Sequence, residues 1–348
     1  MRRGERQLQR RSTFWLVAYG LTILLLGGSI LTPLYEVYQN LWRFSEGMLT
    51  VVYAVYVAGI LVALPCTGRL SDRVGRRPVL LSALALAATS AVVFATAPRV
   101  GSLIVARTLQ GLAIGAFSGA ATAALTESEP RGDDRFAALV STACVPSGFA
   151  AGALLSGALV EYAPRPTVLV YLVYLGLLVP ALAGAWAIPE AGPDGHQARF
   201  PMRLRPLELL PEARPRFVTV AAAVFCAFAM VGLLAALAPS IVVQLLRVDS
   251  PLVGGLAVTV AYGASATAQL TASRTADRPA IVRGLLLLVG GLVLIEASVP
   301  TGSLVAFLVG ATVTGLGHGL TSKATGSLFL VGIKAEPSTR EHPLEQRP

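Results

Sequence analysis

The sequence predicts an all-α polytopic membrane protein, and three observations lead to this prediction. Hydrophobic residues make up 54% of the 348 residues and charged residues only 14%, so too little polar material remains to cover a water-facing surface. Apolar runs long enough to cross a bilayer recur along the chain. The basic residues gather in alternate connections between these runs. The same composition excludes a disordered chain, a collagen and a coiled coil.

A bilayer core about 30 Å thick needs roughly 20 apolar residues in a helix. Runs that meet this requirement lie at residues 14–35, 47–67, 78–97, 101–125, 136–160, 167–188, 217–240, 251–272, 280–299 and 301–322. We expect a helix in each because lipid offers no hydrogen bonds to an irregular backbone. The first run is too long for the core of a signal peptide and no small-x-small cleavage site follows it, so we expect an uncleaved span.

The distribution of Lys and Arg orients these spans. With residues 1–13 placed in the cytoplasm as a basic N-terminal tail, the inner connections and tails hold 23 Lys and Arg. The outer connections hold 4, namely Arg43, Arg99, Arg165 and Arg247. Because basic residues accumulate on the cytoplasmic side, both termini are predicted to be cytoplasmic, in the inner or plasma membrane of the cell. This asymmetry accounts for the net charge of +9 without a nucleic-acid partner.

The helix rhythm repeats after roughly 200 residues, because runs starting at 14, 47, 78 and 101 are matched by runs starting at 217, 251, 280 and 301. The repeat predicts a six-span half over 14–188, a Pro- and Arg-rich cytoplasmic linker over 189–216, and a four-span half over 217–322. Parallel repeats of six spans are one transporter architecture. Residues 323–348 contain no further span and are predicted to form a cytoplasmic tail.

This early stop has two explanations. Either the protein naturally has ten spans, or its coding sequence ends or shifts frame near residue 323. We favour the second because the repeat breaks abruptly. In that case the hydrophobic faces of the eighth and tenth spans are expected to lose neighbours and to meet lipid or each other.

The connection between the second and third spans carries a recognisable motif. It reads Gly68-Arg69-Leu70-Ser71-Asp72-Arg73-Val74-Gly75-Arg76-Arg77-Pro78. Two glycines permit close approach and positive φ, and Pro78 suits the first turn of the third span, so a tight cytoplasmic hairpin is predicted. Positive-inside charge alone explains the arginines but not Asp72 between the two glycines at this spacing.

This motif resembles the signature loop of the major facilitator superfamily. The resemblance implies a two-half helical bundle in which twelve spans are usual, and a transporter that works by alternating access. It also implies a cytoplasmic gate formed by Gly68, Asp72, Arg73, Gly75, Arg76 and Arg77. In such a gate Asp72 pairs with loop arginines and faces the N-terminus of an eleventh helix, where a carboxylate is worth about 0.3–2 kcal/mol.

The fourth span contains Arg107, Gln110 and Gly111, which resemble a second motif of the same family, R-x-x-Q-G. An arginine inside a span costs about 2.5–3.5 kcal/mol on insertion scales, so it normally faces the bundle interior or water. Arg107 and Gln110 lie three residues apart and share a helix face, which favours an intramembrane polar site. The alternative is that Arg107 extends to the outer interface.

The fifth span contains Gly148, Gly152 and Gly157 and is similar to the antiporter motif of the family, with Ala153 in place of Pro and Ser156 in place of Gly. These glycines indicate either an antiporter helix or simple helix packing, and the sequence leaves both open.

Few other polar groups lie inside the spans. Glu36 and Glu296 are candidates for coupling acids by location, although an interfacial position suits them better. His318 is better explained as a packed polar residue than as a proton relay. The cysteines and histidines match no metal spacing or disulfide framework, and no P-loop or hydrolase motif is found.

We therefore predict a secondary transporter of a small molecule, working by proton-coupled efflux. The alternatives are a truncated membrane protein that does not transport and an importer of sugars or metabolites. We expect a monomer that is not an enzyme and has no cofactor and no metal, with protons, membrane lipid and a small molecule as its partners. The apolar spans do not identify the substrate.

Overall fold

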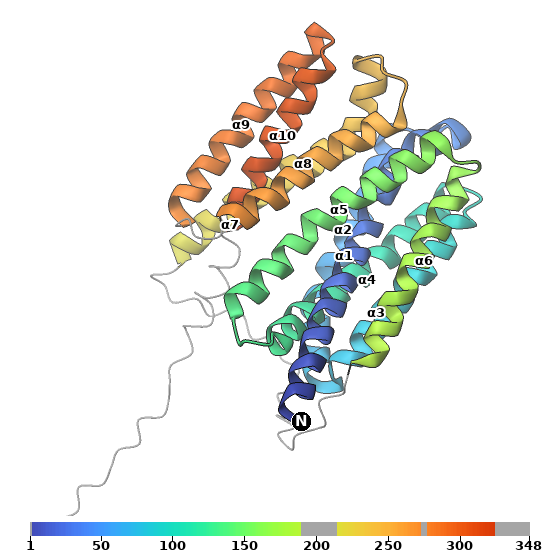
Figure 1. Ribbon diagram of the computed structural model, residues 1–348. Coiled ribbons are helices and arrows are strands. Elements are labelled where there is room, and N and C mark those ends of the chain that lie inside the picture. The colour runs from blue at the N-terminus through green and yellow to red at the C-terminus, as the bar shows by residue number, and fades with distance from the viewer. Residues whose placement is uncertain (1, 189–213, 273–276, 324–348) are drawn as a thin grey trace, which may run out of the picture.

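A computed structural model describes residues 2–188, 214–272 and 277–323, and in these ranges the protein is helical without strands (Figure 1). The long helices are α1 (Arg2–Trp42), α2 (Glu46–Val74), α3 (Arg76–Ala95), α4 (Val100–Ser128), α5 (Asp134–Tyr162), α6 (Pro166–Ala187), α7 (Arg214–Ser240), α8 (Pro251–Thr271), α9 (Asp277–Thr301) and α10 (Leu304–Ser322). A π-helical segment, Ile241–Leu245, continues α7. Each of the 10 helices found in the described ranges is long and apolar enough to cross a membrane, which confirms the predicted fold class.

The connection over 68–77 differs from the predicted hairpin loop. Helix α2 continues to Val74 and α3 begins at Arg76, so only Gly75 separates them. Gly75 has φ +98°, a conformation that a residue without Cβ adopts at little cost, and its N–H donates to the carbonyl of Ser71. The charged residues suggested a loop, but Arg69, Asp72 and Arg73 fall within the last turns of the helix α2.

Two predicted boundaries also move. The basic residues of 1–13 are helical from Arg2, and α7 begins at Arg214 rather than at 217. Most of the predicted linker and tail, residues 189–213 and 324–348, lies outside the described residues.

The two halves repeat the same local structures. Helices α2 and α3 both pack on α4, and α8 and α9 both pack on α10. Ser45 caps α2 and Ser250 caps α8, and each side-chain oxygen accepts from the backbone N–H three residues on. Arg43 and Arg247 both take a left-handed conformation, with φ 52° and 57°. The spacing of these pairs matches the repeat of roughly 200 residues seen in the sequence.

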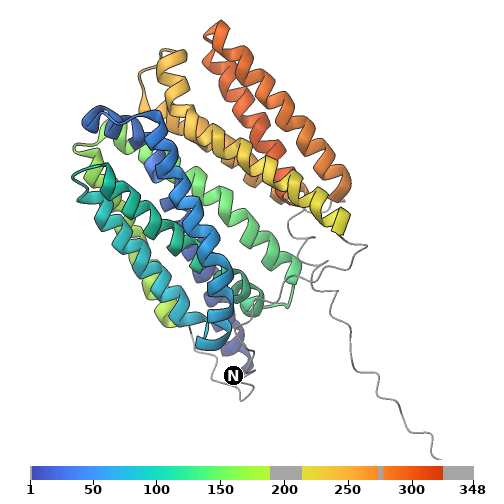
Figure 2. The same cartoon turned by 180° about the vertical axis from the view of Figure 1, so that it is seen from behind.

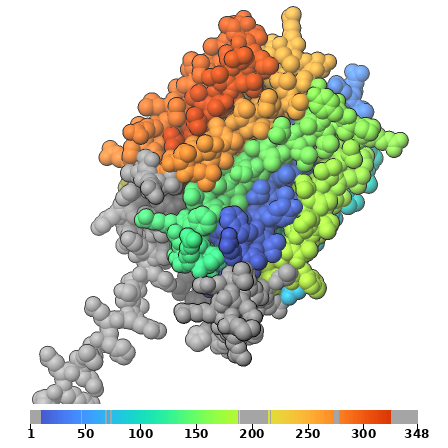
Figure 3. Space-filling model, in the orientation of Figure 1, coloured from blue at the N-terminus to red at the C-terminus, as the bar shows by residue number. Residues whose placement is uncertain are grey.

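The halves meet mainly along α5 and α8, which lie against each other in the ribbon and space-filling views (Figures 1 and 3). Near Gly157 and Gly255 the two backbones touch, and a Cβ on Gly157 would stand 3.1 Å from the carbonyl oxygen of Pro251. The Thr259 hydroxyl donates to the carbonyl of Ala150 at 3.1 Å. These contacts join the C-terminal part of α5 to the N-terminal part of α8, the end of the bundle predicted to face outside. We call this contact the α5–α8 seam.

The spans over 251–272 and 301–322 were expected to meet lipid or each other, and as α8 and α10 they pack on each other. Half of the most apolar stretch of α8 and of α10 is buried, against 28% for α2 and 22% for α7. The reason is that α8 packs on α5 and α10, and α10 also packs on α9. The exposed apolar faces belong instead to α2 and α7, which face the viewer in Figure 2, and to α9.

Candidate functional site

Arg107 lies at the centre of the N-terminal half and is completely buried, with 0% of its surface exposed. It therefore faces the bundle interior and does not reach the outer interface. Its Nη1 donates to the carbonyl of Gly28 at 2.9 Å and to Oε1 of Gln110 at 2.6 Å. Its Nε and Nη2 both donate to the hydroxyl of Tyr35, at 3.2 and 2.9 Å. The second predicted motif residue, Gln110, donates to the carbonyl of Gly27 at 2.8 Å.

Three tyrosine rings surround the guanidinium. Its central carbon lies 4.9 Å from the ring centre of Tyr56, 5.6 Å from that of Tyr53 and 5.7 Å from that of Tyr35. Among the described residues no carboxylate pairs with Arg107, so cation–π contacts and charge-assisted hydrogen bonds must offset the cost of burying its charge. We call Arg107, Gln110, Tyr35, Tyr53 and Tyr56 the Arg107 cluster; it links α1, α2 and α4.

Glycines bring these helices close enough for the cluster to form. A Cβ on Gly111 would collide with the carbonyl oxygen of Tyr56, which explains why the third residue of the predicted motif is glycine. A Cβ on Gly28 would meet the hydroxyl of Tyr56 at 2.8 Å and the ring of Phe149 at 2.9 Å. Tyr35, Tyr53 and Tyr56 were not predicted as site residues; the one feature of the sequence that indicates them is the spacing of Tyr53 and Tyr56 by three residues on one span.

The predicted gate residues are described in part. Arg76 pairs with Glu127 at the end of α4 at 2.8 Å, and its Nη1 donates to the Ser71 hydroxyl at 3.0 Å. The guanidinium carbon of Arg77 lies 4.7 Å above the ring centre of Trp186 on α6. These contacts tie the α2–α3 connection to α4 and α6 within the first half. The side chains of Asp72 and Arg73, and the environment of Gly68, lie outside what the structure describes.

The predicted antiporter helix, α5, uses its glycines for close contacts on two sides. Gly148 and Gly152 face α1, where a Cβ would meet the backbone carbonyls of Thr22 and Leu26. Gly157 faces α8 across the α5–α8 seam. One helix thus holds α1 on one side and the second half on the other.

A second polar cluster lies in the C-terminal half. His318 on α10 is 1% exposed, and its Nδ1 lies 2.7 Å from the hydroxyl of Ser265 on α8. The amide nitrogen of Gln269 donates to the hydroxyls of Ser265 at 3.4 Å and of Ser322 at 3.0 Å. Nε2 of His318 and Oε1 of Gln269 are buried without a hydrogen-bond partner. We call these four residues the His318 cluster.

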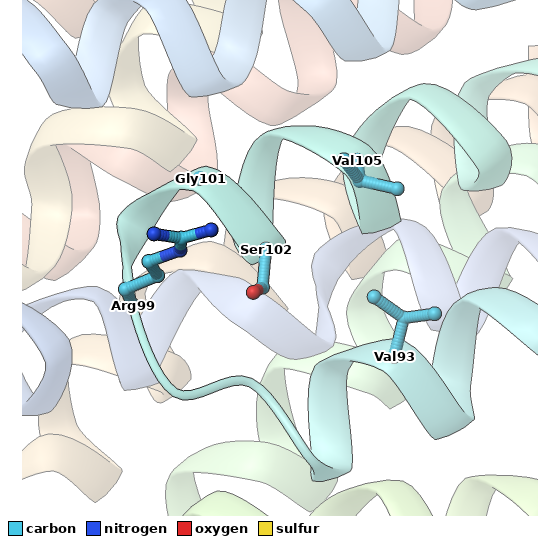
Figure 4. A pocket seen from close by; sticks show the side chains of 5 residues that line it. All are labelled: Val93, Arg99, Gly101, Ser102 and Val105. Carbon is cyan, nitrogen blue, oxygen red and sulfur yellow. The ribbon is translucent and has the colours of Figure 1, made fainter.

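A surface hollow of about 310 Å³ lies at the connection between α3 and α4 (Figure 4). Its lining residues are Val93, Arg99, Gly101, Ser102 and Val105, none of which belongs to the Arg107 cluster or the His318 cluster. Arg99 is the one charged residue among these five. The hollow lies on the outside of the first half, away from the α5–α8 seam.

The sequence profile of the Major Facilitator Superfamily matches residues 17–338. The chain belongs to this superfamily. It is a multi-pass membrane protein, and the relatives found for it are named as transporters and resistance proteins rather than as enzymes.

Named relatives within the Major Facilitator Superfamily resemble parts of the chain. An arabinose-proton symporter from Bacillus subtilis is 38% identical over 114 residues, which cover 32% of this chain and 23% of the symporter. The class C tetracycline resistance protein from Escherichia coli is 34% identical over 182 residues, 51% of this chain and 44% of that protein. The alignments thus span less than half the length of these relatives.

Solved structures of the superfamily share the fold. The xylose transporter XylE from E. coli, in a partially occluded inward-open conformation, aligns with a TM-score of 0.71 over 93% of this chain and 85% of XylE at 14% identity. A bacterial homologue of the human lysosomal transporter Spinster, inward-facing, aligns with a TM-score of 0.67 over 93% of this chain and 79% of that chain at 16% identity.

Proposed function

We propose that the protein is a secondary transporter that moves a small molecule across the membrane by alternating access and exports it in exchange for protons. The observation that carries this proposal is the α5–α8 seam, which joins two repeated helical halves at one end of the bundle. Small residues and few hydrogen bonds make this contact. Ala150 and Ala153 of α5 lie in the same hydrophobic core as residues of α7, α8 and α10, so separation of the halves would withdraw these two small side chains from that core.

The Arg107 cluster lies next to this seam and supports a role in substrate binding. Tyr56 and Phe149 both lie close to Gly28, and Phe149 stacks on Tyr262 of the second half with ring centres 5.0 Å apart. A movement of Phe149 at the seam would therefore alter the packing of Tyr56, whose ring lies against the guanidinium of Arg107. Because no carboxylate among the described residues neutralises the cluster, its positive charge favours a neutral or anionic substrate over a cationic one.

We propose that the α2–α3 connection, with Asp72 and its neighbouring arginines, acts as the cytoplasmic gate. The motif itself and the attachment of Arg76 and Arg77 to α4 and α6 support this role. We also place the protein in the plasma membrane with both termini in the cytoplasm, on the basis of the 23-to-4 distribution of Lys and Arg.

Export is favoured by the similarity of α5 to antiporter helices and by the name of the tetracycline resistance relative. Proton-coupled sugar uptake is the second candidate, because the arabinose-proton symporter has the higher identity, although over a shorter segment. Both candidates use the same cycle and differ in direction and substrate.

The test uses bacteria that lack their own efflux pumps. Export predicts lower tetracycline accumulation in cells that make the protein, and proton release from acidified inverted vesicles when tetracycline is added. Faster arabinose entry coupled to proton entry would instead establish the second candidate. If cells and vesicles with the parent protein handle tetracycline and arabinose in the same way as those with the Arg107→Ala variant, the proposal is contradicted for both substrate classes.

A further inference from the structure

We propose that His318 is the residue that takes up and releases the coupled proton. This inference rests on the proposed proton-coupled transport and deepens it. His318 lies on α10, in the half opposite to Arg107, and belongs to neither predicted motif. A neutral histidine ordinarily titrates near pH 6.5, which makes it suited to exchange protons between the two sides of a membrane.

The hydrogen bonds of the His318 cluster assign the proton of the neutral imidazole. Gln269 donates one amide hydrogen to Ser322 and the other to Ser265. The Ser265 hydroxyl is then free to donate to Nδ1 of His318. This arrangement uses every hydrogen of Ser265 and of the Gln269 amide, and it places the imidazole hydrogen on Nε2, which has no partner.

Proton uptake needs only one change in this arrangement. The arriving proton binds Nδ1, the Ser265 hydroxyl rotates to accept it, and the imidazole gains one positive charge. Release reverses the step. No other bond forms or breaks. The imidazolium then carries two N–H donors, and Oε1 of Gln269 is an unpartnered acceptor within the same cluster.

The cluster connects His318 to one end of the bundle. Ser322 is the last residue of α10, and Gln269 lies in the last turn of α8. A continuous set of polar side chains therefore leads from the end of both helices to a histidine four residues inside α10. That end is the one predicted to face the cytoplasm, so the His318 cluster lies nearer the cytoplasm than the α5–α8 seam does.

Other titratable groups near His318 do not compete for this role. On α8 the facing group is Tyr262, whose ring centre lies 6.3 Å from that of His318 and whose hydroxyl ordinarily titrates near pH 10. On α7, Phe228 faces the histidine at 4.6 Å between ring centres, and Cys226 is exposed. On α9, Arg283 and Glu296 are both exposed.

Elsewhere in the described spans, carboxylates that could carry a proton lie near helix ends and are at least partly exposed; these are Glu36, Glu127, Asp134, Glu161 and Glu296. The buried Glu129 follows the end of α4, where its carboxylate accepts from the backbone N–H groups of Arg131 and Asp133. Arg107 is buried but keeps its charge at every physiological pH. Among the buried ionisable residues within these described spans, His318 is thus the one whose side-chain type ordinarily titrates nearest to neutral pH.

Ring contacts also connect His318 to the contact between the halves. Its neighbour Tyr262 stacks on Phe149 of α5, next to the α5–α8 seam. A new positive charge on His318 in this low-dielectric region changes the energy of the packing around Tyr262. Protonation can therefore shift the balance between the closed and open forms of the seam.

The experiment compares the parent chain with His318→Gln and Thr312→Val in vesicles with an imposed pH gradient, using tetracycline and arabinose as probes. Thr312→Val is the matched control, because the Thr312 hydroxyl bonds only the backbone of its own helix α10. The expected result for His318→Gln is at least a tenfold loss of gradient-driven accumulation with exchange of labelled probe across equal pH retained. Thr312→Val is expected to match the parent in both assays.

Gradient-driven accumulation by His318→Gln equal to that of the parent would overturn the inference and leave the proposed function standing. If the parent transports neither probe, the proposed function fails for those probes, and a second measurement decides the inference. Carbon-13 NMR of labelled histidine in lipid nanodiscs, assigned with His318→Gln, is expected to show His318 gaining its charge as the pH is lowered from about 8 to about 3. A neutral imidazole throughout this range would contradict the proposal.

Discussion

At the residue scale, the N-terminal half is organised around a buried cation without a counter-ion. Arg107 is held by the backbone carbonyl of Gly28, the amide oxygen of Gln110 and the Tyr35 hydroxyl, which accepts from two of its nitrogens. Hydrogen bonds to charged groups contribute about 1.5–3 kcal/mol when the alternative is an unsatisfied buried group. Tyr35 therefore stabilises the junction of α1 and α4 more than its size suggests.

We expect Tyr35→Phe to destabilise the folded protein by about 1.5–3 kcal/mol, because it leaves Nε and Nη2 of Arg107 without their acceptor. Tyr174→Phe is the matched control, since the Tyr174 hydroxyl is buried without a hydrogen-bond partner. The measurement is the midpoint of thermal unfolding in detergent. Equal midpoints for the two variants would contradict the role given to Tyr35.

Transport measurements on two variants distinguish the charge of Arg107 from its planar hydrogen-bonding group. Lysine keeps the charge of Arg107 but loses the planar group that bonds Tyr35, Gly28 and Gln110 together. In inverted vesicles with an imposed pH gradient, we expect Arg107→Ala to abolish gradient-driven accumulation of substrate and Arg107→Lys to retain a small fraction of it. Transport by Arg107→Ala at the parent level would show that this arginine only anchors the helix.

At the element scale, glycine contacts decide how close the helices come. Gly111 on α4 meets the carbonyl of Tyr56 on α2, and Gly315 on α10 meets the carbonyl of Ala261 on α8, so both halves use the same device. Such contacts exclude any side chain, because a backbone oxygen cannot move aside as a flexible side chain can.

We expect Gly111→Ala and Gly315→Ala each to cost about 1–3 kcal/mol of stability through overpacking. Gly263→Ala and Gly290→Ala are the controls, since a Cβ at these helical positions meets nothing within 4 Å, and they are expected to be neutral or to stabilise slightly. Thermal unfolding of all four variants checks this difference. A loss of stability in the controls as large as in the contact variants would show that helix flexibility, not packing, explains these glycines.

The helices were predictable from the sequence, whereas their contacts were not. The length of an apolar run decides whether it can span the bilayer, and the spacing of Arg107 and Gln110 alone places them on one helix face. Tyr35 could not be assigned to Arg107, because a contact across 72 residues depends on how each helix is rotated about its axis, and the same holds for Tyr53. The helical end of α2 up to Val74 was missed because its charged residues resemble those of a loop.

At the scale of the whole molecule, the distribution of Lys and Arg predicts the orientation. We expect a phosphatase that is active only outside the cytoplasm to stay inactive when fused after Pro348, and to be active when inserted beside Arg165 in the connection between α5 and α6. Enzyme activity in colonies carrying each fusion measures this. Strong activity of the Pro348 fusion would reverse the assigned topology.

The central claim is that two rigid halves separate at the outer end of α5 and α8. Tyr162 and Asp249 are exposed residues on opposite sides of the α5–α8 seam, next to Glu161 and Ser250, whose side chains are hydrogen-bonded at 2.9 Å. Arg99 and Tyr162 form a control pair within the first half. Each pair can carry spin labels on introduced cysteines once Cys66 and Cys226, the exposed native cysteines among the described residues, are replaced.

The most direct test is the distance between labels on Tyr162 and Asp249, measured by pulsed electron resonance in nanodiscs at pH 8 and pH 5.5. We expect a short distance that matches the closed seam and a second, longer distance whose population changes with pH, while the Arg99–Tyr162 pair keeps one distance throughout. A single short distance for Tyr162 and Asp249 under both conditions would contradict the separation of the halves at this seam.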